Sequence, residues 1–278
     1  MKTILVPIDF SKVAHNAYLY ARELANFFDY KVKVVHVYGG ELDAMERLAL
    51  QSGDTPFHYL LNKINKFVEE TGGSGDVLTK VDVEVEILEG NVVKKIVEQS
   101  QSDEIAMIVA GTEGHYNWLD QLTGSITSSL AQKANCPVML IPKGVKYSKF
   151  SNMLYASDFS SADEKLILRF IDFAKQFDAS VHFIHIEDED DIDFTAIEDS
   201  IFNLLFKDGD PDFSFNMVSI NGVDVISGLN QYSEENDIDL IVLVNRHRAF
   251  IDNLLGLSTT RQLAMDTNFP LMVYHFND

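Results

Sequence analysis

Three glycines and a serine lie between residues 111 and 125, in a segment that could bind phosphate through its backbone amides. Gly111 and Gly114 are separated by two residues, and Gly124 follows after nine more, next to Ser125. Glycine lets backbone amides approach phosphate oxygens closely, and the free amides at a helix N-terminus add donors at the positive end of the helix dipole. The Ser125 hydroxyl is a further donor. The chemistry that this segment indicates is the binding of phosphate.

Two observations leave a different interpretation of this loop open. Gly111 and Gly114, taken alone, could simply turn the chain, which is a common role of loop glycines. Glu113 lies between them and Asp120 follows in the same loop, so two carboxylates could lie close to the expected phosphates. If these carboxylates point inward, nucleotide binding requires a divalent cation or fails.

The loop has to be positioned by the strand before it and the helix after it. Apolar runs of strand length alternate with helical patterns along the whole chain, which predicts βαβ crossovers and parallel sheets covered on both faces. The expected fold class is α/β, with doubly wound, Rossmann-like, five-stranded parallel sheets flanked by helices. Such sheets bind ligands at the carboxyl ends of their strands. The expected strands are Thr3–Ile8, Val32–Tyr38, Val81–Leu88, Ile105–Ala110, Val138–Ile141, Met153–Ser157, Val181–Ile186, Phe213–Ile220, Leu240–Val244 and Leu271–Phe276.

An internal repeat divides these strands into two sets. Residues 4–11 recur as residues 153–160, and residues 34–37 recur as residues 183–186 at the same offset. The ends of the two halves also repeat. This self-similarity predicts tandem domains, which we place at residues 1–146 and 147–278. In each domain a serine, Ser11 or Ser160, is expected to cap the first helix.

The glycine spacing and the first strand together resemble a known family. Glycine, two residues, glycine, nine residues and glycine-serine is similar to the ATP-binding signature of the universal stress protein superfamily, and residues 6–11 resemble its opening strand and turn. The resemblance covers essentially the whole chain, twice, which indicates a tandem two-domain form. It implies that the first domain binds ATP or a related adenine nucleotide, with Mg²⁺ as a candidate companion.

The resemblance also implies which residues form the site. The nucleoside end would lie near Pro7, Asp9 and the backbone of Val37, whereas the ribose and phosphates would be surrounded by Gly111, Gly114, Gly124, Ser125 and Ile126. Asp9 has a second interpretation, because an aspartate in this turn could instead cap the first helix.

The second domain keeps the repeat but loses the first two glycines. The same spacing places Asn245 and Arg248 at their positions, and either Gly256 or Ser258 at the helix start. Bulky side chains obstruct a close approach of the backbone, although Arg248 leaves a different anion contact open. We therefore expect a degenerate loop here, and a structural role for Asp158, the counterpart of Asp9.

The net charge restricts the classes of partner. The chain has 43 acidic and 22 basic residues and a formal charge of −21, which repels phosphate backbones and anionic lipid surfaces. We expect neither nucleic acid nor membrane as a partner. The same charge opposes ATP at long range, so a nucleotide site has to rely on local amides and a divalent cation. Because no apolar run reaches membrane-spanning length, the expected location is the cytoplasm.

No catalytic residue can be assigned from the sequence. The chain lacks the lysine-anchored NTPase loop Gly-x-x-x-x-Gly-Lys-Ser/Thr. Its histidines lack the spacing of metal ligands: His182 and His185 are expected on opposite faces of one strand, and His36 is expected to be a satisfied histidine at a strand end. Cys136 is expected to pack as a small apolar side chain. The prediction is a protein that is not an enzyme and has no metal ligands of its own.

The leading hypothesis is a cytoplasmic stress-response protein that binds ATP in its first domain and uses occupancy as a conformational or partner-binding switch. Two alternatives stay open: an interaction scaffold that binds no nucleotide, and a slow metal-assisted ATPase. The resemblance further implies that the two domains pair through their last strands, residues 138–141 and 271–276, which would satisfy two sheet edges. A homodimer of tandem chains and an unidentified protein partner complete the expected partners.

Overall fold

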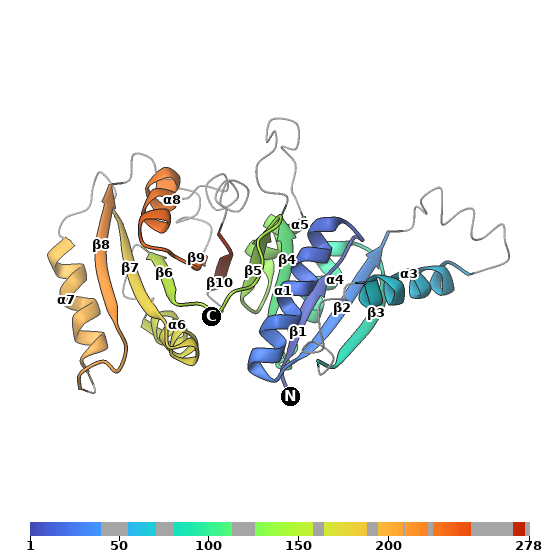
Figure 1. The fold of residues 1–278 in the computed structure, drawn as a ribbon, viewed down its shortest axis with the longest axis horizontal. Helices are drawn as coiled ribbons and strands as arrows, with labels where there is room; N and C mark the ends of the chain where they lie inside the picture. The colour runs from blue at the N-terminus through green and yellow to red at the C-terminus, as the bar shows by residue number, and fades with distance from the viewer. Residues whose placement is uncertain are drawn as a thin grey trace. The chain divides into compact units, whose positions relative to one another are not determined.

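The chain forms two compact units, Met1–Tyr147 and Ser148–Phe276. A computed structural model describes residues 1–39, 55–70, 81–112, 126–157, 164–187, 194–207, 209–221, 225–245 and 269–275. Each unit is a parallel sheet flanked by helices (Figure 1), so the predicted α/β, Rossmann-like fold class is confirmed. Among the described helices, none combines the length and the apolarity that crossing a bilayer requires.

The first unit alternates strands and helices throughout. Its strands follow the order β3-β2-β1-β4-β5 and are all parallel. Right-handed crossovers place α1 and α3 on one face of this sheet, and α4 and α5 on the other. The elements are β1 (Thr3–Pro7), α1 (Lys12–Phe28), β2 (Lys31–Tyr38), α3 (Pro56–Glu70), β3 (Val83–Glu89), α4 (Val92–Gln99), β4 (Ile105–Thr112), α5 (Ile126–Lys133) and β5 (Val138–Pro142).

The second unit repeats this topology. Its strand order is β10-β9-β6-β7-β8, again all parallel. Its core contains a stacked aromatic pair, Tyr155 and Phe170, whose ring centroids lie 5.0 Å apart. The elements are β6 (Asn152–Ser157), α6 (Glu164–Phe177), β7 (Ser180–Glu187), α7 (Phe194–Leu205), β8 (Phe215–Asn221), α8 (Val225–Glu235), β9 (Leu240–Asn245) and β10 (Leu271–His275).

All ten predicted strands are present, with ends that differ from the prediction by one or two residues. The inner strands were recognisable because a parallel strand covered on both faces is apolar along its length, whereas the outer strands β3 and β8 mix apolar and polar residues. In β1, for example, Ile4, Leu5 and Val6 are completely buried. The start of β8 is the clearest difference: pairing with β7 begins at Phe215 opposite Val181, so Phe213 lies in the preceding turn.

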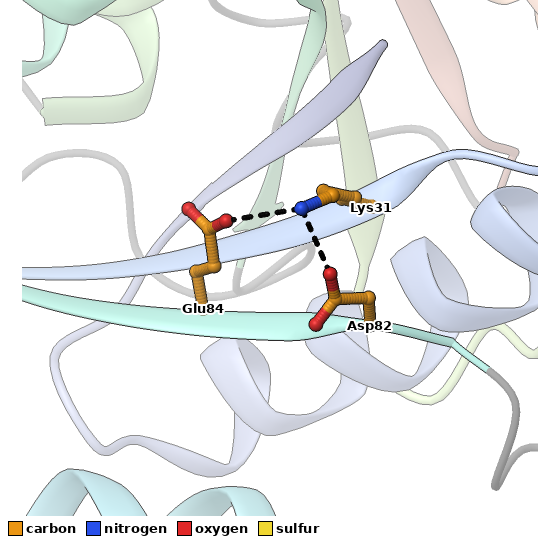
Figure 2. Close-up of polar contacts among 3 residues, drawn as sticks. All are labelled: Lys31, Asp82 and Glu84. Atoms are coloured by element: carbon orange, nitrogen blue, oxygen red, sulfur yellow. Dashed lines mark hydrogen bonds and ion pairs between the residues drawn. The ribbon is translucent and has the colours of Figure 1, made fainter. Parts of the chain in front are cut away.

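The outer strand β3 is joined to β2 by ion pairs as well as by main-chain hydrogen bonds. Lys31 Nζ lies 2.9 Å from a carboxylate oxygen of Asp82 and 3.3 Å from one of Glu84 (Figure 2). Lys33 Nζ lies 2.7 Å from Glu86. The hydrogen bonds that Lys31 donates to the carboxylates of Asp82 and Glu84 raise the pKa of its ammonium group. Charged side chains on an edge strand hinder pairing with another chain, so this edge of the sheet is protected.

Candidate functional site

The strand order of the first unit reverses between β1 and β4, which are hydrogen-bonded neighbours. Pro7 ends β1, and Gly111 is the last residue but one of β4. From these two ends the chain continues to helices on opposite faces of the sheet. Open α/β sheets bind ligands in the crevice outside such a reversal, at the carboxyl ends of the strands. This edge is therefore the candidate site.

The turn between β1 and α1 is fixed by two side-chain hydrogen bonds. Asp9 Oδ1 accepts from the backbone N–H of Ser11 at 2.9 Å, and Ser11 Oγ accepts from that of Ala14 at 3.1 Å. Ser11 is thus the N-cap of α1, as predicted. Phe10 adopts a left-handed conformation with a φ of 63°. Asp9, an exposed residue, therefore has a structural role in this turn whether or not it also contacts a ligand.

Gly111 lies against the first turn of α1. A Cβ atom at this position would meet the carbonyl oxygen of Val13 at 2.5 Å and Val13 Cγ1 at 2.6 Å. Real Cβ contacts are not this short, so no other residue fits unless α1 moves away from β4. The Gly111 carbonyl also accepts a hydrogen bond from Thr127 Oγ1 in α5 at 3.4 Å. The spacing pattern assigned this glycine to phosphate binding; the structure adds a packing reason that the pattern does not reveal.

The end of β2 is connected to the same turn. His36 Nδ1 donates to the carbonyl oxygen of Ile8 at 2.9 Å, which places the ring proton on Nδ1. This agrees with the prediction of a satisfied strand-end histidine. Its neighbour Val37 has a buried side chain, which leaves the backbone as the part of this residue that a ligand would use. Pro7 of β1 pairs with Val35 of β2. Asp9 and Val37 each follow this pair by two residues, so both lie at the carboxyl edge of the sheet.

A cationic and aromatic group from α3 covers the turn, and the sequence analysis did not find it. Lys63 Nζ lies 4.3 Å from the centroid of the Phe10 ring and 5.9 Å from that of Tyr59. The Phe10 ring also lies 4.6 Å from His36 and 5.9 Å from Phe67. Both distances to Lys63 fall in the range of cation–π interactions. No spacing rule connects a lysine in α3 to a phenylalanine after β1, because folding alone brings them together.

The remaining residues of the expected phosphate site are only partly described. Ile126 opens α5 and has a side chain that is 44% exposed. Gly114, Gly124 and Ser125 lie outside the described residues, as do Glu113 and Asp120. Four of the eight expected site residues, Pro7, Asp9, Val37 and Gly111, are thus placed at one edge of the sheet.

The described part of the chain was expected to lack metal ligands and to bury Cys136. No group of three or more His, Cys, Asp or Glu side chains there could hold a metal ion. Cys136 is buried, and burial raises the pKa of its thiol to about 12, so it packs as a neutral side chain at neutral pH, as expected. His182 is buried too, and its Nδ1 lies 2.8 Å from the Tyr232 hydroxyl.

The equivalent edge of the second unit is described less completely. Asn245, at the position of the first glycine, ends β9. The buried His185 occupies the position of His36. Asp158, Ser160, Arg248, Gly256 and Ser258 lie outside the described residues, so the degenerate loop of this unit stays a prediction.

Comparison with known proteins finds universal stress proteins among the relatives of this chain. Residues 1–142 match the model of the Universal stress protein family. Universal stress protein MJ0531 of Methanocaldococcus jannaschii is 28% identical over 155 residues, which cover 52% of this chain and 84% of that protein. A universal stress protein structure from Archaeoglobus fulgidus DSM 4304 covers 98% of both chains, with a TM-score of 0.72 and 18% identity.

A second solved structure also matches nearly the whole chain. The putative universal stress protein from Pseudomonas aeruginosa UCBPP-PA14 matches 99% of this chain and 93% of its own, with a TM-score of 0.62 and 14% identity. At these identities the structural matches show a shared fold. Both extend over the two units.

Proposed function

Because the chain belongs to the universal stress protein family, we propose that its first unit binds an adenine nucleotide, with ATP as the expected ligand. Occupancy of the site then acts as a conformational or partner-binding switch in a stress-response protein of the cytoplasm. The observation that carries this proposal is the position of Gly111. This first glycine of the signature lies beside the end of β1, where the strand order reverses.

The described residues support a division of the site into two ends. Pro7, Asp9 and the backbone of Val37 are available to the base and ribose at the ends of β1 and β2. The segment from Gly111 to Ile126 is available to the phosphates, since it connects β4 to the N-terminus of α5. Free amides at a helix N-terminus are suited to phosphate oxygens.

Because the chain is acidic, a nucleotide site in it needs cations that offset the charge of the phosphates. A formal charge of −21 opposes a polyphosphate at long range. Lys63 is one local cation at this edge, and its ammonium lies over the Phe10 ring beside the β1–α1 turn. We expect Mg²⁺ to accompany ATP and to offset the remaining charge of the phosphates.

Isothermal titration calorimetry with ATP, in the presence and absence of Mg²⁺, tests the proposal. The unaltered chain should bind. Gly114→Arg should abolish binding by filling the loop, whereas Gln101→Arg should bind normally. Gln101 is exposed and precedes the amino end of β4, so this control adds the same charge at the opposite end of the strand. If the unaltered chain binds no Mg-ATP at millimolar concentration, the scaffold alternative replaces the switch.

We also propose that the role is one of binding rather than catalysis. The sequence lacks the lysine-anchored NTPase loop, and no group of three or more His, Cys, Asp or Glu side chains among the described residues could hold a metal ion. Prolonged incubation of the purified protein with Mg-ATP should therefore release no more phosphate than incubation of the Gly114→Arg variant. A higher rate that the variant abolishes would instead establish a slow ATPase.

A further inference from the structure

The outer strands of the two sheets occupy equivalent positions in the repeat but differ in charge. Strand β3 carries three carboxylates, Glu84, Glu86 and Glu89. Val83 pairs with Val32 in the first unit, and Phe215 pairs with Val181, the repeat of Val32, in the second. The register therefore aligns the three carboxylates with uncharged residues of β8, which are Asn216, Val218 and Asn221.

The lysines that pair with the β3 carboxylates are missing from the second unit as well. Lys31 and Lys33 of β2 correspond to Ser180 and His182 of β7. The whole arrangement of cross-strand charge is thus replaced by uncharged side chains. Natural sheets protect their edges with charge, and an edge strand without it is ready to pair with another strand.

Strand β8 has main-chain groups available for such pairing. The N–H of Val181 donates to the carbonyl of Ser214 at 2.9 Å, and bonds in a parallel ladder involve every second residue of each strand. Phe215 and Met217 therefore direct their N–H and C=O groups away from β7. Among the described strands, β7 is the one neighbour of β8.

Four phenylalanines next to this edge form what we call the aromatic shelf: Phe202, Phe206, Phe213 and Phe215. Phe202 and Phe206 of α7 both contact Phe215, with ring centroids 5.8 Å and 6.3 Å from it. Helix α7 lies beside β8 at this margin of the second unit (Figure 1). Phe202 and Phe206 are nevertheless 41% and 42% exposed. Large aromatic side chains exposed together are typical of interaction sites.

The charge of the second unit indicates the chemistry of the partner. This unit holds more than half of the 43 acidic residues of the chain but little more than a third of the 22 basic ones. Asp210 and Asp212 lie in the turn before β8, and Asp199 is exposed on α7. Lys175 pairs with Asp212 and lies 5.5 Å from the centroid of the Phe213 ring. The excess of acidic over basic residues in this unit attracts a basic partner and repels a second copy of this chain.

We propose that the β8 edge and the aromatic shelf form a docking site for an extended, basic peptide segment of a partner protein, which adds to the sheet as a further strand. Main-chain hydrogen bonds to β8 provide affinity, as in other cases of strand addition. Alternate apolar side chains of the segment pack on the shelf, and its basic side chains meet the acidic surroundings.

Fluorescence anisotropy with a labelled peptide of alternating lysine and valine, about eight residues long to match an edge strand, tests the proposal on the full chain. The measurement is made at about 0.15 M salt, where distant exposed charges are screened. The same peptide methylated on alternate backbone nitrogens keeps its charge but cannot complete the ladder. It should bind at least about tenfold more weakly, since several hydrogen bonds are lost.

Two proline variants provide a matched pair in the protein. Met217→Pro removes an N–H that points away from β7 and leaves the ladder to β7 intact, which an edge strand tolerates. It should weaken peptide binding about tenfold. Val85→Pro makes the same change at the equivalent position of β3 and should leave binding unaltered. Should Met217→Pro fail to fold, the double change Phe202→Gln and Phe206→Gln, at exposed positions, should also weaken binding.

Three results would overturn the proposal. Equal affinity for the methylated and unmethylated peptides would show adsorption by charge alone. Equal binding by the double glutamine variant and the unaltered chain would exclude the shelf. Sedimentation that shows a dimer of this chain, abolished by Met217→Pro and not by Val85→Pro, would assign the β8 edge to a second copy instead.

Discussion

For Gly111, the sequence pattern and the structure give two different reasons for a glycine. The glycine spacing predicts that it approaches phosphate, whereas its position against Val13 requires glycine for packing. The N-cap role of Ser11 and the burial of Cys136 were predictable, because caps and small apolar positions depend on local sequence. The contact between Gly111 and α1 was not, because it joins residues far apart in the chain.

Gly111→Ala is expected to destabilise the chain even without a ligand. The added Cβ overlaps the Val13 carbonyl, so α1 must shift, which costs about 1–3 kcal/mol as in other overpacked sites. Urea denaturation of the two purified proteins measures the loss. Gly39→Ala is the matched control, because a Cβ there meets nothing within 4 Å. Equal stability of the Gly111 variant and the parent would mean that α1 is not held against β4.

His182 is expected to make the stability of the second unit sensitive to acid. Burial lowers the pKa of this histidine, so the unfolded chain takes up a proton at a higher pH than the folded one. The stabilisation by the neutral side chain is therefore complete above the unfolded pKa of about 6.5 and is lost as the pH falls below it.

Measurement of the unfolding free energy between pH 8 and pH 5 should show this loss, and His182→Gln should flatten that part of the profile. Tyr232→Phe removes the hydroxyl that lies 2.8 Å from His182 Nδ1 but keeps the histidine buried, so its profile should still slope. A profile unchanged by His182→Gln would assign the pH dependence to other groups.

At the scale of elements, the strands were predictable and the attachment of α3 was not. A run of buried β-branched residues identifies a strand by itself, as in β2. Helix α3, in contrast, is held over the β1–α1 turn by contacts that its own sequence does not reveal. Phe67 lies 5.6 Å from the His15 ring and 5.9 Å from those of Phe10 and Tyr18. The residues that α3 adds to the candidate site, Lys63 above all, were missed for this reason.

Phe67→Ala should release α3 from the turn. The side chain is 8% exposed, and truncation of a buried phenylalanine costs about 3–5 kcal/mol. Hydrogen exchange should rise across residues 56–70 more than in β5, which lies at the opposite end of the first unit's strand order from β3. Phe57→Ala, at a position of the same helix that is 50% exposed, should change exchange little. An equal rise of exchange in β5 and in residues 56–70 would show that α3 does not open separately from the sheet.

At the scale of the whole molecule, the two units share a topology but differ in the loop after the fourth strand and in the charge of the outer strand. The repeat in the sequence was sufficient to predict this tandem α/β arrangement, because two copies of one pattern fold by the same rules. The pairing expected between the last strands of the two units stays a prediction. The consequences of divergence depend on individual positions: the first unit has the signature glycines, whereas the second has the uncharged β8 edge.

This asymmetry predicts that ATP stabilises one unit selectively. A ligand that binds only the folded first unit adds about 2.7 kcal/mol at a concentration one hundred times its dissociation constant. Hydrogen exchange with saturating Mg-ATP should therefore slow in β1 and β4 and stay unchanged in β6 and β9. Gly114→Arg should remove the effect, and Gln101→Arg should keep it. Equal protection of both pairs of strands would mean that the second unit binds nucleotide too or unfolds together with the first, and either result contradicts a site confined to the first unit.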